Sequence, residues 1–289
     1  MSLPPIEIPL GAMRFNSDSS KLEYWNGSAW FQIHTFSPDF DGGSGRGMFA
    51  GGDFNNIIDS FTISTQGNAV DHGDLTTNKS LTSATASRTR GLLIGGNNPT
   101  LSPGDTYTNT IDFWSMSSAG NASDFGDLTV AKRQGSSVSS PTRGIYAGGF
   151  DDTNRLNNID LITIASAGNA TDFGDLTDAR QELGGASDNT RGVFAGGYDS
   201  PARVNIIDFI TIASAGNASD FGDTQAARDE STGTSNNIRG VFAGFNDGGR
   251  QNSIYFVTIQ TTGDAQDFGD LITKRTGVSN CSDSHGGLS

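Results

Sequence analysis

The side chains of this sequence that are best suited to chemistry are carboxylates. Glu182, Asp229 and Glu230 stand at the start of the first strand in units of a repeat described below. Two carboxyl groups that face one channel can act as the acid and the base of glycoside hydrolysis. The corresponding residues of other units are Ser80, Gln134 and Thr276. Because that mixture fits an irregular polar channel equally well, glycoside hydrolysis is an alternative and not the main prediction.

Histidine and cysteine give little support to catalysis. The histidines are His34, His72 and His285, and the one cysteine is Cys281. A nucleophile, histidine and acid arrangement needs a histidine in a shared cleft, and no motif here places one. We expect His72 to be a packed corner residue and Cys281 a small packed side chain. The chain is therefore predicted not to be an enzyme.

Recurring aspartates raise the question of calcium. One set follows an apolar run at Asp59, Asp112, Asp160 and Asp208, and another set lies in DFGD turns such as Asp172 with Asp175. Calcium needs six to eight converging oxygens, and Asp-x-x-Asp alone supplies too few. Recurrence favours a structural role, either in capping tight turns or in pairing with a recurring Arg. We predict no metal site and no cofactor, with calcium at these turns as the alternative.

An internal repeat must position these residues. An Arg-Gly pair recurs with steps of 44, 53, 48 and 48 residues, at Arg46, Arg90, Arg143, Arg191 and Arg239. A GNA-x-DFGD turn recurs with steps of 53, 48, 48 and 47 residues, ending at Asp74, Asp127, Asp175, Asp223 and Asp270. Two landmarks with the same period indicate five copies of one structural unit.

Each unit has the pattern of a small antiparallel sheet. In residues 183–224, LGGASD is small and polar, RGVFAGG is apolar, NIIDFITIAS is a longer apolar run and SDFGDT is a short edge. In the third segment Ile206 and Ile210 face one side and Ile207 and Phe209 the other, as in a strand covered on both faces. Glycine doublets and Asn/Asp clusters supply the turns. Each unit is predicted to hold four strands.

The two ends of the repeat predict how these sheets are arranged. Similar sheets packed face to face around an axis form a β-propeller. The first unit lacks a polar first strand, but residues 277–287, GVSNCSDSHGG, resemble that strand at the other end of the chain. Placed beside residues 47–51, they would complete the first sheet and leave no free edge. The predicted fold is all-β: a five-bladed propeller over residues 46–289 that is closed by the C-terminal strand. An open solenoid is the alternative.

The unit resembles a kelch repeat. The resemblance rests on a polar strand after Ala179-Arg180, an apolar strand ending in Gly196-Gly197, and a longer strand that runs to an aromatic corner. The corner Trp of that family is replaced here by Phe125, Phe173, Phe221 and Phe268 and by His72. The resemblance implies a kelch-like propeller and carries no enzymatic implication.

Residues 1–45 lie outside the repeat and form a second, smaller domain. Asn/Ser/Asp and Asn-Gly turns join three predicted strands, at 12–16, 21–25 and 30–33. So small a β-hairpin segment cannot bury its aromatic side chains alone, so it must dock on something. The candidate attachment residues are Arg14, Phe15, Tyr24, Trp25 and Trp30.

The same segment resembles a short module of bacteriophage tail and fibre proteins. The matching residues are Gly11, Arg14, Phe15, Asn16, Leu22, Glu23, Tyr24, Asn26, Gly27 and Trp30. The repeats with their GNA-x-DFGD corner also resemble repeats in proteins of marine cyanophages. The resemblance implies a virion protein, assembled in the host cytoplasm and attached by its front segment to other virion proteins. A capping hairpin on a cellular propeller is the alternative.

Ligand contacts are expected where the units differ, because insertions between repeats map to loops on one face. The spacers after the glycine doublets hold 5, 14, 9, 9 and 8 residues. The loop candidates for a host-surface glycan or protein are Tyr107, Asp151, Asp152, Arg155, Tyr198, Arg203 and Arg250.

The charge excludes one class of partner. The formal net charge is −14, whereas nucleic acids and anionic membranes are bound through concentrated positive charge. No window of 18 apolar residues indicates membrane insertion.

The predicted function is a non-enzymatic phage tail or fibre protein for host attachment. A capsid or tail decoration protein and a lectin are further alternatives. Fibre association allows a homotrimer, although no coiled-coil heptad supports one.

Overall fold

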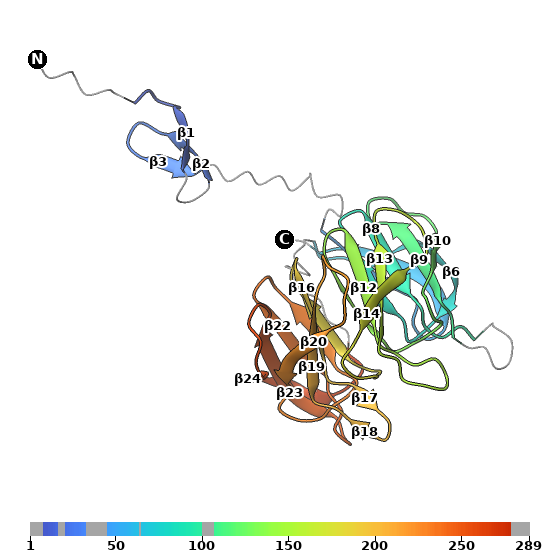
Figure 1. Cartoon of the computed structure of the whole chain (residues 1–289). Coiled ribbons are helices and arrows are strands. Elements are labelled where there is room, and N and C mark those ends of the chain that lie inside the picture. Colours follow the sequence, from blue (N-terminus) through green and yellow to red (C-terminus); the bar gives the residue numbers. More distant parts are fainter. Residues whose placement is uncertain (1–7, 17–20, 33–44, 64, 100–106, 279–289) are drawn as a thin grey trace, which may run out of the picture. The chain divides into compact units, whose positions relative to one another are not determined.

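The computed structural model describes residues 8–16, 21–32, 45–63, 65–99 and 107–278. The chain divides into two compact units, Met1–Asp41 and Gly42–Ser289, which are treated separately. Within the described ranges every regular element is a β-strand, and the strands pair antiparallel (Figure 1). The all-β prediction is confirmed.

The smaller unit is a three-stranded sheet of β1 (Met13–Asn16), β2 (Lys21–Trp25) and β3 (Trp30–Gln32). Its second turn forms as the Asn-Gly pair predicts: Asn26 Oδ1 accepts hydrogen bonds from the backbone N–H groups of Ser28 and Ala29. The strands lie within one residue of the predicted bounds, and residue 33 is outside the described ranges.

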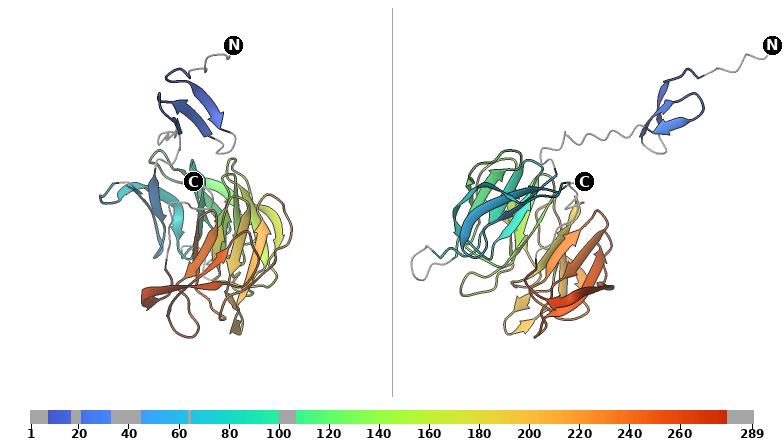
Figure 2. Two further views of the ribbon diagram at one scale, coloured as in Figure 1. Left: turned by 90° about the vertical axis from the view of Figure 1, so that its left-hand side faces the viewer. Right: turned by 180° about the vertical axis from the view of Figure 1, so that it is seen from behind.

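The larger unit contains five sheets of three or four strands that follow one another in chain order (Figures 1 and 2). The first sheet holds β4 (Arg46–Ala50), β5 (Asn55–Thr62) and β6 (Val70–Lys79). The second holds β7 (Ser83–Ala86), β8 (Arg90–Ile94), β9 (Thr110–Ser115) and β10 (Ser123–Asp127). The third holds β11 (Ser136–Ser139), β12 (Arg143–Ala147), β13 (Asn158–Thr163) and β14 (Thr171–Asp175).

The fourth and fifth sheets repeat this order. The fourth holds β15 (Gly184–Ser187), β16 (Arg191–Ala195), β19 (Ile206–Thr211) and β20 (Ser219–Asp223), with a short hairpin of β17 (Tyr198–Asp199) and β18 (Ala202–Arg203) between β16 and β19. The fifth holds β21 (Thr232–Ser235), β22 (Arg239–Ala243), β23 (Gln251–Thr258) and β24 (Gln266–Arg275). Four strands per unit are thus seen in sheets two to five. Residues 279–289, which hold most of the strand predicted to complete the first sheet, lie outside the described ranges.

The apolar cores lie between successive sheets. Because the third strands carry apolar side chains on both faces, the second, third and fourth sheets each pack against both neighbours. Phe194 and Ile210 of the fourth sheet, for example, pack with Ile145 and Phe173 of the third, and all four are almost fully buried. The polar first strands also meet: Ser187 Oγ donates to the carbonyl oxygen of Ser139 at 3.1 Å.

The contact zone between two successive sheets is called a seam below. Each of four seams contains the same backbone hydrogen bond. A turn glycine donates its N–H to the carbonyl oxygen of the preceding sheet's corner residue at 2.6–2.7 Å, in the pairs Gly120–His72, Gly168–Phe125, Gly216–Phe173 and Gly263–Phe221. The DFGD glycine leaves room for this approach. At Gly174, where φ is +143°, a Cβ would lie 2.5 Å from the carbonyl carbon and oxygen of Gly216.

Four of the five Arg-Gly arginines also lie in seams, but they do not bind the recurring Asp, so that prediction was wrong. Arg191 Nη1 donates to the carbonyl oxygen of Ile259 in the next sheet at 3.0 Å, and Arg46, Arg90 and Arg143 make the same bond. On β19, Arg191 lies opposite Thr211, three residues beyond Asp208. That offset is about 10 Å along a strand, too far for an ion pair.

Three of the four recurring aspartates instead pair with a cation that lies shortly before their own sheet in the chain. The pairs are Lys79–Asp112 at 3.0 Å, Lys132–Asp160 at 2.8 Å and Arg180–Asp208 at 2.9 Å, and all six side chains are fully buried. In the fifth sheet Tyr255 takes the place of the Asp, and Arg228 lies over its ring at 5.0 Å. The predicted structural role of these aspartates is confirmed with a different partner.

Candidate functional site

Short backbone ladders join the connections between the sheets. Each ladder pairs the residue after the buried cation, the residue after the glycine doublet, and a residue that returns from the spacer. The ladders are Ser80–Asn97–Tyr107, Arg133–Phe150–Arg155, Gln181–Tyr198–Arg203 and Asp229–Asn246–Arg250. These residues are called the loop face below.

Arginine and aromatic side chains stack from one ladder to the next. The Arg133 guanidinium lies 4.7 Å from the ring centroid of Tyr107 and 5.7 Å from that of Phe150. The Arg155 guanidinium lies 5.1 Å from the rings of both Phe150 and Tyr198. Such cation–π contacts contribute about 0.5–1 kcal/mol each at exposed sites. The stacks therefore hold these side chains in place across three sheets.

The structure brings most of the predicted loop candidates together. Tyr107, Arg155 and Tyr198 belong to the stack, and the Tyr107 hydroxyl donates to Asp152 Oδ1 at 2.9 Å. Arg203 continues the series by its ion pair with Asp229 at 2.9 Å. Their role in ligand binding stays a prediction.

The other two loop candidates lie elsewhere in this face. Asp151 Oδ1 accepts the N–H groups of Thr153 and Asn154, so this side chain shapes its own turn. Arg250 pairs with Asn246 through the backbone and is exposed. Neither side chain contributes to the stack.

Sequence reasoning missed Arg133 and Phe150. A signal was present, because both fall at the ladder positions that Gln181 and Tyr198 occupy in the next unit. Comparing the residues after each buried cation and each glycine doublet would have selected them.

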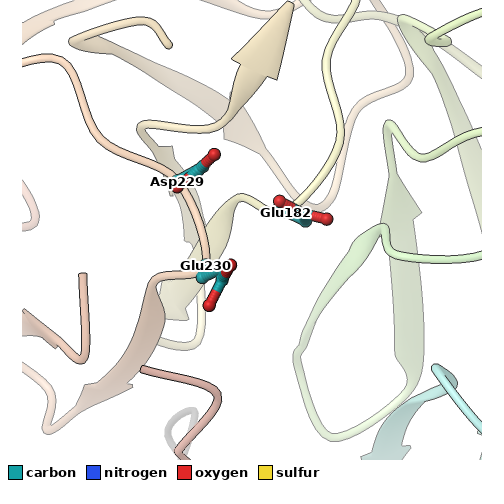
Figure 3. Close-up of side chains that lie close together, drawn as sticks. All are labelled: Glu182, Asp229 and Glu230. Carbon is teal, nitrogen blue, oxygen red and sulfur yellow. The ribbon is translucent and has the colours of Figure 1, made fainter. Parts of the chain in front are cut away.

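An acidic cluster occupies the loop face between the fourth and fifth units (Figure 3). Glu182 comes from one connection, and Asp229 and Glu230 from the next. One carboxylate oxygen of each lies within 4.8 Å of the others. Glu182 and Glu230 have φ values of +60° and +53°, as do Leu81 (+52°) and Gln134 (+57°) at the same position. A left-handed conformation costs non-glycine residues on the order of 1 kcal/mol or more, so the surrounding ladders must hold it.

Each carboxylate of the cluster uses one oxygen for a protein donor. Glu182 Oε1 accepts the amide nitrogens of Gln134 at 2.5 Å and of Gln181 at 3.2 Å. Glu230 Oε1 accepts Asn246 Nδ2 at 3.1 Å, and Asp229 Oδ1 accepts Arg203 Nε at 2.9 Å. No other described side chain donates a hydrogen bond to these three carboxylates, and the backbone of Asp229 also bonds its own carboxylate.

Burial and mutual repulsion raise two pKa values in the cluster. The pKa of Glu182 is raised first by burial and further by the negative charges of Asp229 and Glu230. Burial also raises the pKa of Asp229, although Arg203 opposes this. Such a group can hold a proton for acid catalysis or share a cation.

The other acids and the histidine have structural partners. In the DFGD turns, Asp124, Asp172 and Asp220 each accept through Oδ1 the N–H of the glycine two residues later. His72 is 2% exposed and its Nε2 lies 2.9 Å from the carbonyl oxygen of Ser115, as expected for a corner residue. His34, Cys281 and His285 lie outside the described ranges.

The attachment candidates lie on two opposite faces of the N-terminal sheet. On one face Arg14 pairs with Glu23 at 2.9 Å and lies over Trp30 at 4.3 Å, and Trp30 packs on Trp25. These three candidates stabilise the sheet itself. The other face is apolar and exposed, and its residues, called the apolar face below, are Met13, Phe15, Leu22, Tyr24 and Phe31.

No protein-family model matches the chain, and no curated protein matches it. In the described part of the chain, no helix has the length and apolar character needed to cross a membrane.

Proposed function

We propose that residues 46–289 form a five-bladed, kelch-like β-propeller, and that the chain is a non-enzymatic structural protein of a phage virion. The small N-terminal sheet fastens it to other proteins of a tail or fibre, and the loop face is presented to the host surface. The observation that carries this proposal is the apolar face of the N-terminal sheet, in the segment that resembles a phage tail module.

The propeller is supported by exposed apolar residues on the first and fifth sheets. Ile63 is 67% exposed, whereas Ile164, Ile212 and Ile259 at the same position are buried in seams. Phe268 is 53% exposed, whereas Phe125, Phe173 and Phe221 are buried. In the made seams, the later sheet contributes the isoleucine and the earlier sheet contributes the phenylalanine. The first sheet has an exposed isoleucine of this kind, and the fifth sheet has an exposed phenylalanine. Joining them in a fifth seam removes this apolar area from water.

The repeated contacts specify what that fifth seam contains. Gly67 would donate its N–H to the carbonyl oxygen of Phe268, and Arg239 would bind the carbonyl oxygen of Ile63. Arg275, which lies opposite Gln251 as Lys79 lies opposite Asn55, would pair with Asp59. We also propose that residues 277–287 form a strand beside β4 and complete the first sheet.

The attachment role follows from the chemistry of the apolar face. Phe15 and Tyr24 are 66% and 40% exposed, on a sheet too small to bury both faces. A surface with these aromatic side chains and no charge suits a protein partner. A virion protein assembled in the host cytoplasm meets such partners during particle assembly.

The test measures incorporation into particles. The full-length double variant F15S/Y24S should be absent from purified particles, because the face lost its aromatic anchors while the Arg14–Glu23–Trp30 side stayed intact. The control F54S removes an aromatic residue, 43% exposed, from the larger unit and should be incorporated normally. Incorporation of F15S/Y24S at the wild-type level, or absence of the wild-type protein from particles, contradicts the proposal. Antibody labelling on a capsid instead of a tail would favour the decoration role.

Glycoside hydrolysis is the second candidate, because Glu182 has a raised pKa beside two further carboxylates. The enzyme hypothesis expects the wild type to cleave a host polysaccharide and the E182Q/E230Q variant to lose that activity. The proposal of a non-enzymatic protein expects no cleavage by either.

A further inference from the structure

We propose that Glu182, Asp229 and Glu230 form a calcium site in the loop face, with the side-chain amides of Gln134 and Gln181 supplying further oxygen ligands. The site is independent of the virion role.

The first support is the close approach of the three carboxylates. The three carboxylates approach within 4.8 Å, a separation that one ion at normal calcium–oxygen distances spans. One oxygen of each carboxylate already accepts a hydrogen bond. Gln134 and Gln181 donate to Glu182, Asn246 donates to Glu230, and Arg203 donates to Asp229. These bonds fix the carboxylates beside one another.

The second support is an unpartnered buried oxygen beside the cluster. Gln181 is 8% exposed, and its Oε1 is buried with no hydrogen-bond donor among the described residues. Its amide nitrogen lies 3.2 Å from Glu182 Oε1, so this amide is at the edge of the cluster. Gln134 has the same arrangement, with its Oε1 buried and unpartnered and its nitrogen on Glu182. A buried amide oxygen without a donor is costly, and coordination to a cation removes that cost.

Charge favours a divalent ion. The three carboxylates face one bonded guanidinium, that of Arg203, and Arg133 acts on Glu182 only from a distance. Negative charge therefore remains at the cluster. Three carboxylates and two amide oxygens give five ligands, which water completes. Calcium accepts such an irregular oxygen set, whereas magnesium requires near-octahedral geometry and retains its water.

The test uses full-length protein freed of divalent ions. Titration calorimetry with calcium chloride should show one strong site, and magnesium chloride should bind more weakly. The E182Q/E230Q variant should lose at least about tenfold in calcium affinity. The Q181L variant, which removes the amide oxygen, should bind several-fold more weakly. The control D124N/D172N removes two carboxylates of the DFGD turns and should bind as the wild type does.

Two outcomes overturn the calcium site. One is the absence of calcium binding to the wild type. The other is unchanged affinity in E182Q/E230Q; a loss in D124N/D172N would in that case place calcium at the turns. Thermal unfolding without calcium separates a loss of calcium binding from a loss of folding. E182Q/E230Q should then unfold at the same temperature as the wild type or higher, because the repulsion among the acids is relieved.

Discussion

The buried ion pairs show at the residue scale how one side chain joins two sheets. Lys132 comes from the connection after the second sheet, and its Nζ lies 2.8 Å from Asp160 Oδ2 on the third. The same Nζ donates to Asn158 Oδ1 at 2.9 Å, and Thr129 donates to Asp160. Burial lowers the pKa of Lys132, and the charge of Asp160 opposes this. Each charge of the pair thus has several polar partners.

Removing one partner should therefore be costly. K132M leaves Asp160 buried without its cation and should lower the free energy of unfolding by about 3–5 kcal/mol. The double variant K132M/D160L removes both charges and should recover most of that loss. Urea unfolding measures both. A loss below about 1 kcal/mol for K132M would mean that water reaches the carboxylate.

Glu182 should give the stability of the protein a pH dependence. With its folded-state pKa above the ordinary 4.5, it binds a proton more tightly when folded, so ionisation costs stability above that raised pKa. In calcium-free buffer E182Q should unfold at a higher temperature than the wild type near pH 7. The difference should vanish as the pH falls through the raised pKa to 4.5 and below. An advantage of E182Q that is constant across this range would rule out ionisation as its cause.

At the element scale, periodicity predicted most of the strands. Apolar residues on both parities of NIIDFITIAS led to a strand covered on both faces, and Ile207 and Ile210 are indeed buried. Partners of charged side chains were harder to predict. Whether Asp208 meets Arg191 or Arg180 depends on cross-strand register and on how sheets stack, and neither is local in sequence.

In the candidate site, too, local sequence features could be predicted, whereas contacts between separate units could not. Spacer length directed attention to Tyr107, Arg155 and Tyr198, since insertions gather in loops, and the structure places these side chains in one stack. The stack through Arg133 and Phe150 could not be predicted from one spacer, because it joins residues of separate units. The apolar face of the N-terminal sheet likewise follows from the register Met13–Tyr24–Phe31, which only the paired strands fix.

For the whole molecule, a closed ring depends on the fifth seam. Four seams use a turn glycine packed against a DFGD glycine, and a ring requires Gly67 to pack against Gly269 in the same way. Gly269 has φ +137°, close to the +143° of Gly174, but a Cβ on it would meet no described atom within 4 Å. An alanine at either position would therefore meet similar backbone strain, and the two positions are distinguished by whether a neighbouring turn packs against them.

The most direct test compares the variants G269A and G174A by thermal unfolding of the full chain. At Gly174 the new methyl group collides with Gly216, which should cost about 1–3 kcal/mol beyond the strain. If the five sheets close into a ring, G269A should lower the stability as much as G174A does. A G269A variant that loses clearly less than G174A would contradict the closed propeller.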